Sequence, residues 1–212
     1  MPRKTLTPRE RVHRVFARKA PDRVPLNYSA NPGIDGRLKA HFGLDAKDGE
    51  GLLRALRVDF RTAGLAGYAG PTLHADVPGR RVDMWGIRRR WVEHESGGYW
   101  DYCDFPLREA GLDEVKAWPM PSPDDFDYAA FARRCAGMGD FAVVAGGAGL
   151  GDIINSTGMI RGMEQVLVDL MTDDPAGLRL IDRKLDIQWE VARRTLEAAA
   201  GRVDVLWLGE DL

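Results

Sequence analysis

The stretch "FAVVAGGAGLGD" at residues 141–152 decides the fold class of this chain. Its first six residues are a nearly continuous apolar run, which is typical of a parallel strand that is buried on both faces. A glycine-rich loop follows this run directly and ends at Asp152. A second apolar run at 203–208 comes after a long helical segment. Strands that alternate with helices predict an α/β fold with a parallel sheet.

The same alternation extends outward along the chain. Thr7 and Glu10 have the spacing of a capping box, and Pro8 suits the first position of the helix that they begin. The longest helix opens at Pro175 and is closed by Gly201. The pattern predicts strands and helices in this order: strand 23–28, helices 33–43 and 48–57, strand 58–62, helix 125–137, strand 141–146, helices 159–171 and 175–200, and strand 203–208.

Four parallel strands with helices between them are half of a (β/α)8 TIM barrel, which takes roughly 250 residues in full. We therefore expect residues 1–212 to be the N-terminal part of such a barrel, with its C-terminal half missing. Half a barrel has two unpaired sheet edges, so we expect poor solubility of the chain on its own. A complete open sheet with helices on both faces is the alternative.

Residues 78–104 differ in composition from the rest of the chain. Tryptophans and aliphatic residues alternate with arginines there, and Gly97-Gly98 lies between two such runs. This pattern predicts an antiparallel β-hairpin insertion that covers one end of the main sheet. A proline-rich connector at 106–125 follows it.

Composition excludes several classes of protein. A net charge of −2 argues against nucleic acid as a partner, because phosphate binding needs clustered positive charge. No apolar run approaches the ~18–20 residues of a membrane span, and the N-terminus lacks the apolar core of a secretory signal. Cys103 and Cys135 are far apart and lack metal-ligand spacing. These features predict a cytoplasmic protein without a metal site in this stretch.

Polar side chains at predicted strand ends are the candidates for chemistry. Asp59 and Arg61 lie near the end of the second strand, where they face the same side and either meet a substrate or pair with each other. Glu210 and Asp211 follow the last strand, where burial and proximity of two carboxylates can prepare an acid–base pair. We take Asp59, Glu210 and Asp211 as catalytic candidates and Arg61 as a substrate-binding candidate. The alternatives are that Asp59 is a structural acid and that Glu210 and Asp211 belong to a solvated tail.

The glycine-rich loop supplies the other substrate-binding candidates. Glycines let a backbone approach a ligand closely, and their N–H groups can form an anion-binding nest. The loop lacks the Gly-Lys-Ser/Thr end of a P-loop and the spacing of a dinucleotide fingerprint. We select Gly149, Asp152 and Asn155 here, with a flexible strand-to-helix loop as the alternative.

Several segments together resemble the uroporphyrinogen decarboxylase superfamily. They are "TPRERVHRVFARKAPDRVPLNY" at 7–28, "LLRALRVDFRTAG" at 52–64, the stretch from "GGAGLGD" to "IDRKL" at 146–185, and "GRVDVLWLGEDL" at 201–212. The resemblance implies a (β/α)8 barrel whose active cleft lies at the C-terminal ends of the strands. It also implies that the aspartate at position 59 binds pyrrole N–H groups and opposes the positive charge of a protonated ring.

The resemblance implies two kinds of enzyme. One is a carboxy-lyase that decarboxylates porphyrinogen acetate groups in tetrapyrrole biosynthesis without a cofactor. The other is a methyltransferase that uses zinc and a corrinoid protein partner, with zinc ligands beyond residue 212. Residues 27–33 lack the arginines of the decarboxylase signature, so both stay open, together with a non-catalytic binding domain and a homodimer.

Overall fold

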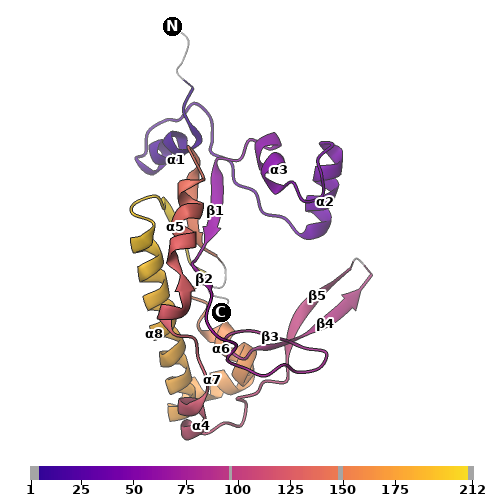
Figure 1. Ribbon diagram of the computed structural model, residues 1–212, viewed down its shortest axis with the longest axis vertical. Helices are drawn as coiled ribbons and strands as arrows, with labels where there is room; N and C mark the ends of the chain where they lie inside the picture. The colour runs from indigo at the N-terminus through magenta and orange to yellow at the C-terminus, as the bar shows by residue number, and fades with distance from the viewer. Residues whose placement is uncertain (1–4, 96, 148–149, 210–212) are drawn as a thin grey trace.

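The main sheet has three parallel strands, with β7 in the centre. The computed structural model describes residues 5–95, 97–147 and 150–209. The strands are β1 (Phe60–Gly64), β7 (Ala142–Gly146) and β8 (Val205–Trp207), in the order β1-β7-β8. Helices separate them along the chain, so the predicted mixed α/β class is confirmed (Figure 1). The described strands form no closed barrel.

The helices follow the predicted order with several changes. The predicted helix 159–171 is in fact two helices, because Gly162 lies between them with a φ of 88°. The connector at 106–125 contains a short helix that the prolines did not suggest. The helices are α1 (Pro8–Phe16), α2 (Pro32–His41), α3 (Gly49–Ala55), α4 (Leu112–Ala117), α5 (Tyr128–Ala136), α6 (Ile154–Arg161), α7 (Met163–Thr172) and α8 (Pro175–Ala198), with a 3-10 turn, η1, at Pro123–Asp125.

The predicted first strand at 23–28 is wrong. This segment is extended but belongs to none of the described sheets. Pro25 has no N–H to donate to a ladder, and the Leu26 N–H is bonded to the Asp59 side chain at 2.8 Å. The segment therefore makes one backbone hydrogen bond to the start of β1, from Asp59 N to Leu26 O at 2.8 Å, and no ladder.

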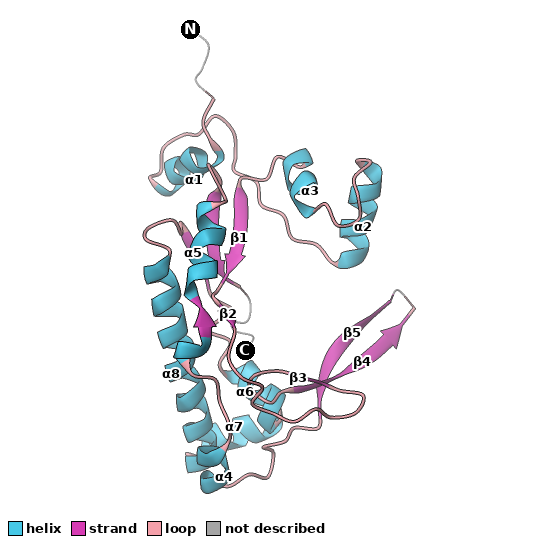
Figure 2. Ribbon diagram, viewed as in Figure 1, coloured by secondary structure: helices cyan, strands magenta, loops and turns pink. Residues whose placement is uncertain are grey.

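The predicted hairpin is confirmed. β3 (Arg81–Val82), β4 (Arg88–His94) and β5 (Gly97–Cys103) form an antiparallel sheet. Trp91 pairs with Trp100 across the strands, and their rings meet edge to face at 5.7 Å. β4 and β5 project away from the main sheet (Figure 2), so the hairpin does not cover its end as expected. β2 (Gly67–Tyr68) and β6 (Phe126–Asp127) form a further short pair.

One face of the parallel sheet packs against α5 and α8. Val143 and Ala145 of β7 meet Phe131 of α5 and Val191 of α8 in a single apolar cluster. Strand alternation sends Thr62 and Trp207 to the opposite face, where Thr62 is exposed and Trp207 is 48 % exposed. The helices therefore cover one face of the sheet and leave the other accessible at both edge strands.

Asp204 joins the first helix to the last strand. Its carboxylate is almost fully buried and accepts hydrogen bonds from Val143 N at 2.8 Å, Arg9 Nε at 2.9 Å and His13 Nε2 at 2.5 Å. Burial raises the pKa of Asp204, but these hydrogen bonds outweigh burial and hold the pKa below its ordinary value of 3.8. The carboxylate therefore stabilises the fold in its charged form.

We expect acid to weaken the fold through Asp204. A carboxyl group whose pKa is lower in the folded state stabilises the protein above its unfolded pKa, and that contribution is lost as the pH falls below it. Urea unfolding of the chain at about pH 5 and about pH 3 should therefore show a drop in the free energy of unfolding. Asp204→Asn should make this drop smaller. An equal drop in the variant would contradict the assignment.

Candidate functional site

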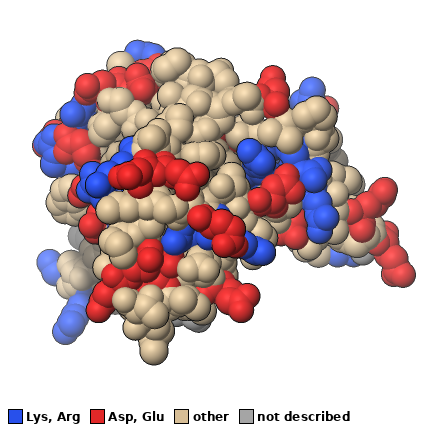
Figure 3. All heavy atoms as spheres, turned by 90° about the horizontal axis from the view of Figure 1, so that it is seen from below, with Lys and Arg blue, Asp and Glu red and all other residues tan. Residues whose placement is uncertain are grey.

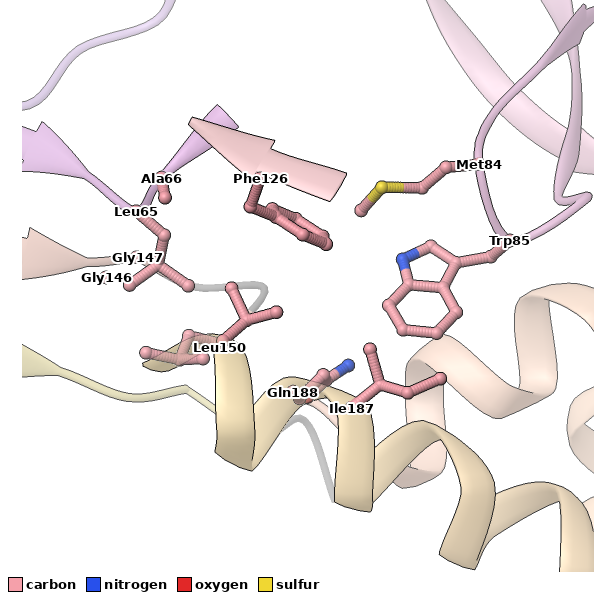
Figure 4. Close-up of a pocket in the computed structure, with 11 residues that line it drawn as sticks. Leu65, Ala66, Met84, Trp85, Phe126, Gly146, Gly147, Leu150, Ile187 and Gln188 are labelled. Carbon is pink, nitrogen blue, oxygen red and sulfur yellow. The ribbon is translucent and has the colours of Figure 1, made fainter. Parts of the chain in front are cut away.

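A cleft lies where β1 and β7 end, between these strand ends, α8 and the turn that precedes β4. Figure 4 shows its inner part, a cavity of about 310 Å³. In this view Trp85 from the turn lies just above Ile187 of α8, Phe126 lies at the top, and Leu65 and Leu150 lie on the opposite side from Trp85. This part of the cleft, the apolar chamber, is lined by Leu65, Ala66, Met84, Trp85, Phe126, Gly146, Gly147, Leu150, Ile187, Gln188 and Val191.

A second cavity of about 470 Å³ adjoins the first. The two share Met84, Trp85 and Gln188 in their walls, so they are halves of one cleft. The second half, the polar chamber, carries charged and hydrogen-bonding side chains together with apolar ones. It is lined by Tyr68, Asp83, Met84, Trp85, Ile87, Arg89, Asp152, Ser156, Met159, Lys184 and Gln188.

Lys184 is the most deeply buried cation of the cleft. Its side chain comes from the inward stripe of α8, four residues after Leu180 and seven before Val191, and is 1 % exposed. The amine Nζ donates to Ser156 Oγ at 2.9 Å and lies 5.6 Å from the centre of the Trp85 ring. A lysine within an apolar helical stripe was the sequence signal for this residue, and the sequence reasoning missed it.

The turn that carries Trp85 is held by one aspartate. Asp83 Oδ1 accepts from the backbone N–H groups of Trp85 at 2.9 Å and Ile87 at 3.0 Å. Its second oxygen accepts from Arg89 NH1 at 2.7 Å. Gly86 adopts a φ of 83° between them, which a residue with a side chain rarely adopts. Asp83 thereby fixes an aromatic wall and a guanidinium of the polar chamber in place before any ligand arrives.

Gln188 offers an unused acceptor at the junction of the two chambers. Its Oε1 is buried and has no hydrogen-bond partner among the described residues. Buried polar atoms in proteins are almost always paired, so an unpaired one at a cavity wall is a place where a ligand donor fits. The junction therefore combines an amide acceptor with an aromatic face.

One of the predicted substrate-binding residues, Asp152, lines this cleft, and a second, Asn155, is hydrogen-bonded to it. Asp152 is buried and lines the polar chamber, and Asn155 Nδ2 donates to Asp152 Oδ2 at 3.1 Å. Both follow β7 at its carboxyl end, as the strand-and-loop pattern predicted. Gly149, Glu210 and Asp211 lie outside the described residues.

Asp59 lies at the opposite end of the sheet from the position predicted for it. It precedes β1, is fully buried, and accepts from Arg11 NH1 at 2.5 Å and Arg23 NH1 at 2.6 Å. The placement at the carboxyl-end rim is therefore wrong. The Val58 N–H bonds back to Leu53 O at 2.9 Å, so these residues still belong to the turn after α3.

Arg61 also lies away from the cleft. Its guanidinium makes two hydrogen bonds to Glu50, at 2.7 and 3.0 Å, and lies 3.6 Å from the centre of the Phe141 ring. It also donates to the backbone oxygen of Phe60 at 2.7 Å. These contacts tie α3 and the start of β7 to β1, so the structure separates Arg61 and Asp59 from Asp152.

Three further properties of the described residues are metal-binding groups, membrane-spanning helices and surface charge. Over residues 5–95, 97–147 and 150–209, no group of three His, Cys, Asp or Glu side chains is arranged to hold a metal ion. None of the helices in these ranges has the length and apolar character to cross a membrane. Seen from the end that carries α4 and α7, basic and acidic side chains are intermingled (Figure 3).

The chain was also compared with models of known protein families, with curated proteins and with solved structures, and none of them matches it.

Proposed function

We propose that this chain carries the small-molecule site of a uroporphyrinogen decarboxylase-like carboxy-lyase, and that its substrate is a carboxylate bound in the cleft. The observation that supports this most is Lys184, a buried cation in the wall of the polar chamber beside an apolar chamber. Ligand sites combine apolar walls with a few placed polar groups in this way. Lys184 and Arg89 are the cations that a substrate carboxylate meets there.

The parallel sheet favours a barrel as the setting of this site. β1, β7 and β8 lie side by side in chain order, with α5 and α8 on one face. Parallel sheets are rarely left open on a face, and a barrel encloses that face as its interior. We infer that the accessible face with Thr62 and Trp207 is the interior face of a (β/α)8 barrel. The cleft then lies at the strand ends where barrel enzymes place their sites.

Decarboxylation makes three demands on the residues of the cleft. The carboxylate must be held, positive charge must be stabilised on the group that accepts the electron pair, and a proton must replace carbon dioxide. Lys184 and Arg89 meet the first demand through charge-assisted hydrogen bonds. With Asp59 at the far end of the sheet, we assign the second to Asp152, the buried carboxylate that follows β7.

We expect Lys184→Met to weaken carboxylate binding to the full chain by about tenfold or more, which is the loss of about one charge-assisted hydrogen bond. Isothermal titration with uroporphyrin, a stable relative of the expected substrate, measures this. Lys39→Met is the matched control, because Lys39 is also buried but its Nζ lies 2.7 Å from Asp35 on α2. Equal affinities of the two variants for uroporphyrin would refute the site.

Product analysis tests the reaction itself. The full chain, supplied with uroporphyrinogen under anaerobic conditions, should release carbon dioxide and porphyrinogens with fewer carboxyl groups. Binding without release favours the non-catalytic binding domain. Zinc-dependent methyl transfer with a corrinoid partner stays a prediction of the resemblance, which places the zinc ligands beyond residue 212.

A further inference from the structure

We propose that one face of the β4–β5 hairpin is an outer subsite of the cleft, where the rings of a substrate that extends beyond the two chambers stack on exposed aromatic side chains and meet an arginine. This inference rests on the proposed function and extends its site. The face, which we call the aromatic face, consists of Arg81, Arg89, Trp91, Trp100 and Tyr102. The hairpin that carries it projects away from the main sheet (Figure 2).

Strand pairing places these five side chains on one side of the hairpin sheet. Arg89 is directly opposite Arg81 on one neighbouring strand and Tyr102 on the other. Two residues further along β4, Trp91 is opposite Trp100. Directly paired residues, and residues two apart in a strand, have their side chains on the same face. The Arg81 guanidinium lies 4.1 Å from the centre of the Trp100 ring, which confirms this arrangement.

Arg89 joins the aromatic face to the cleft. Its guanidinium lines the polar chamber, where it lies 2.7 Å from Asp83. The face that continues from Arg89 is therefore the side of the hairpin towards the polar chamber. The opposite face is turned towards α2 instead, because Tyr99 lines a groove together with Ile34. A ligand that is held in the polar chamber and extends past Arg89 meets the rings of the aromatic face.

The Trp91 ring is exposed but held in place. It is 50 % exposed, and Tyr102 on the same face is 39 % exposed, so both rings have surface on which a ligand can stack. The Trp91 ring meets the Trp100 ring edge to face at 5.7 Å, and a Cβ on Gly98 would lie 2.4 Å from it. A ring that is fixed before binding loses little conformational entropy when a ligand stacks on it.

The expected substrate needs more than the two chambers. A porphyrinogen has carboxylates on every pyrrole ring, and the apolar chamber would bury such carboxylates without a partner, which is costly. Part of the ring system must therefore lie outside the chambers. On the aromatic face, the Trp91 ring can stack on a pyrrole ring, and the exposed Arg81 can pair with a carboxylate. The ladder also places Glu93 on this face, but beyond Trp91 and towards the tip of the hairpin, away from Arg81.

Calorimetric titration of the full chain with two ligands tests the outer subsite. Uroporphyrin is large enough to reach the aromatic face, whereas indole-3-acetate has a single carboxylate and a ring system that the two chambers can hold. We expect Trp91→Leu and Arg81→Gln each to weaken uroporphyrin binding by about fivefold, which is the loss of about one stacking or charge-assisted contact. Both variants should leave the affinity for indole-3-acetate unchanged.

Two residues on the opposite face of the same hairpin provide the matched controls. Tyr99→Leu removes an exposed aromatic ring, and Arg90→Gln removes an exposed arginine. Neither variant should change the affinity for uroporphyrin. Equal losses in Trp91→Leu and Tyr99→Leu, or in Arg81→Gln and Arg90→Gln, would overturn the outer subsite. Because Arg81 is exposed, Arg81→Gln tests the subsite even where Trp91→Leu disturbs the hairpin, which circular dichroism would report.

Each failure has its own signature. Uroporphyrin binding that Lys184→Met weakens, but Trp91→Leu and Arg81→Gln do not, would overturn the outer subsite and leave the proposed carboxylate site standing. Binding that depends on Trp91 and Arg81 but not on Lys184 would support stacking on this face and overturn the proposed function. A parent chain that is a dimer by light scattering, with Trp91→Leu a monomer of unchanged uroporphyrin affinity, would assign the aromatic face to a second copy and overturn the subsite.

Discussion

Asp59→Asn is expected to lower the free energy of unfolding by about 3 kcal/mol, because it leaves two arginines without their shared buried carboxylate. Arg11 NH1 lies 2.5 Å from one oxygen of Asp59 and Arg23 NH1 lies 2.6 Å from the other. The asparagine keeps the shape but carries no charge, and its amide nitrogen offers a donor where two donors already point. Urea unfolding followed by circular dichroism measures the loss.

Asp22→Asn is the matched control for this effect. Asp22 shares Arg11 with Asp59, through a contact of 2.6 Å, but its side chain is 20 % exposed, so water can replace part of the interaction. We expect a clearly smaller loss than for Asp59→Asn. Equal losses would contradict the larger contribution that we assign to the buried carboxylate.

Gly146→Ala is expected to destabilise the chain by about 3 kcal/mol and to displace β8 from β7. Gly146 has a φ of 84°, which an alanine adopts only under strain. A Cβ at this position would lie 2.3 Å from the backbone oxygen of Trp207, and a strand backbone cannot move aside as a flexible side chain can. Because Gly146 also lines the apolar chamber, ligand binding should be lost together with stability.

The neighbouring glycine provides the comparison. A Cβ on Gly147 meets nothing within 4 Å, and Gly147 has no left-handed backbone, so Gly147→Ala should leave the free energy of unfolding within about 0.5 kcal/mol of the parent chain. Thermal unfolding of both variants measures the difference. Similar melting temperatures for the two alanine variants would show that β8 yields to the added methyl group.

One part of the site's position could be predicted from the sequence. The apolar run that became β7 and the glycines after it placed Asp152 and Asn155 at the carboxyl end of a buried strand, and the structure has both beside the cleft. The capping box at Thr7 was also readable, because Glu10 N donates to Thr7 Oγ1 at 3.2 Å and Glu10 Oε2 accepts from Thr7 N at 2.8 Å. Both predictions depend only on residues that are close together in the sequence, so the spacing of those residues is enough to make them.

The errors concern residues whose partners are distant in sequence. Asp59 was placed at the rim near the carboxyl end of a strand at 58–62, but it directly precedes β1, which begins at Phe60, so it lies at the amino end of that strand. Its partners Arg11 and Arg23 lie 48 and 36 residues away, beyond any local pattern. Lys184 shows the other kind of error, because the apolar stripe was recognisable but the lysine within it was not weighed.

The contact of Asp204 with Arg9 and His13 has a consequence for biosynthesis. Arg9 and Asp204 are 195 residues apart, while α1 also contacts the rest of the fold through Arg11 on Asp59 and through the Arg9 N–H, which donates to the Asp140 carbonyl at 2.8 Å. As the chain leaves the ribosome, α1 therefore emerges long before Asp204, the carboxylate that accepts hydrogen bonds from Arg9 and His13 of this helix. Pairing over such a separation is slow to form. A chaperone that recognises exposed apolar segments therefore has the time in which these 195 residues are made to bind α1 before Asp204 is available.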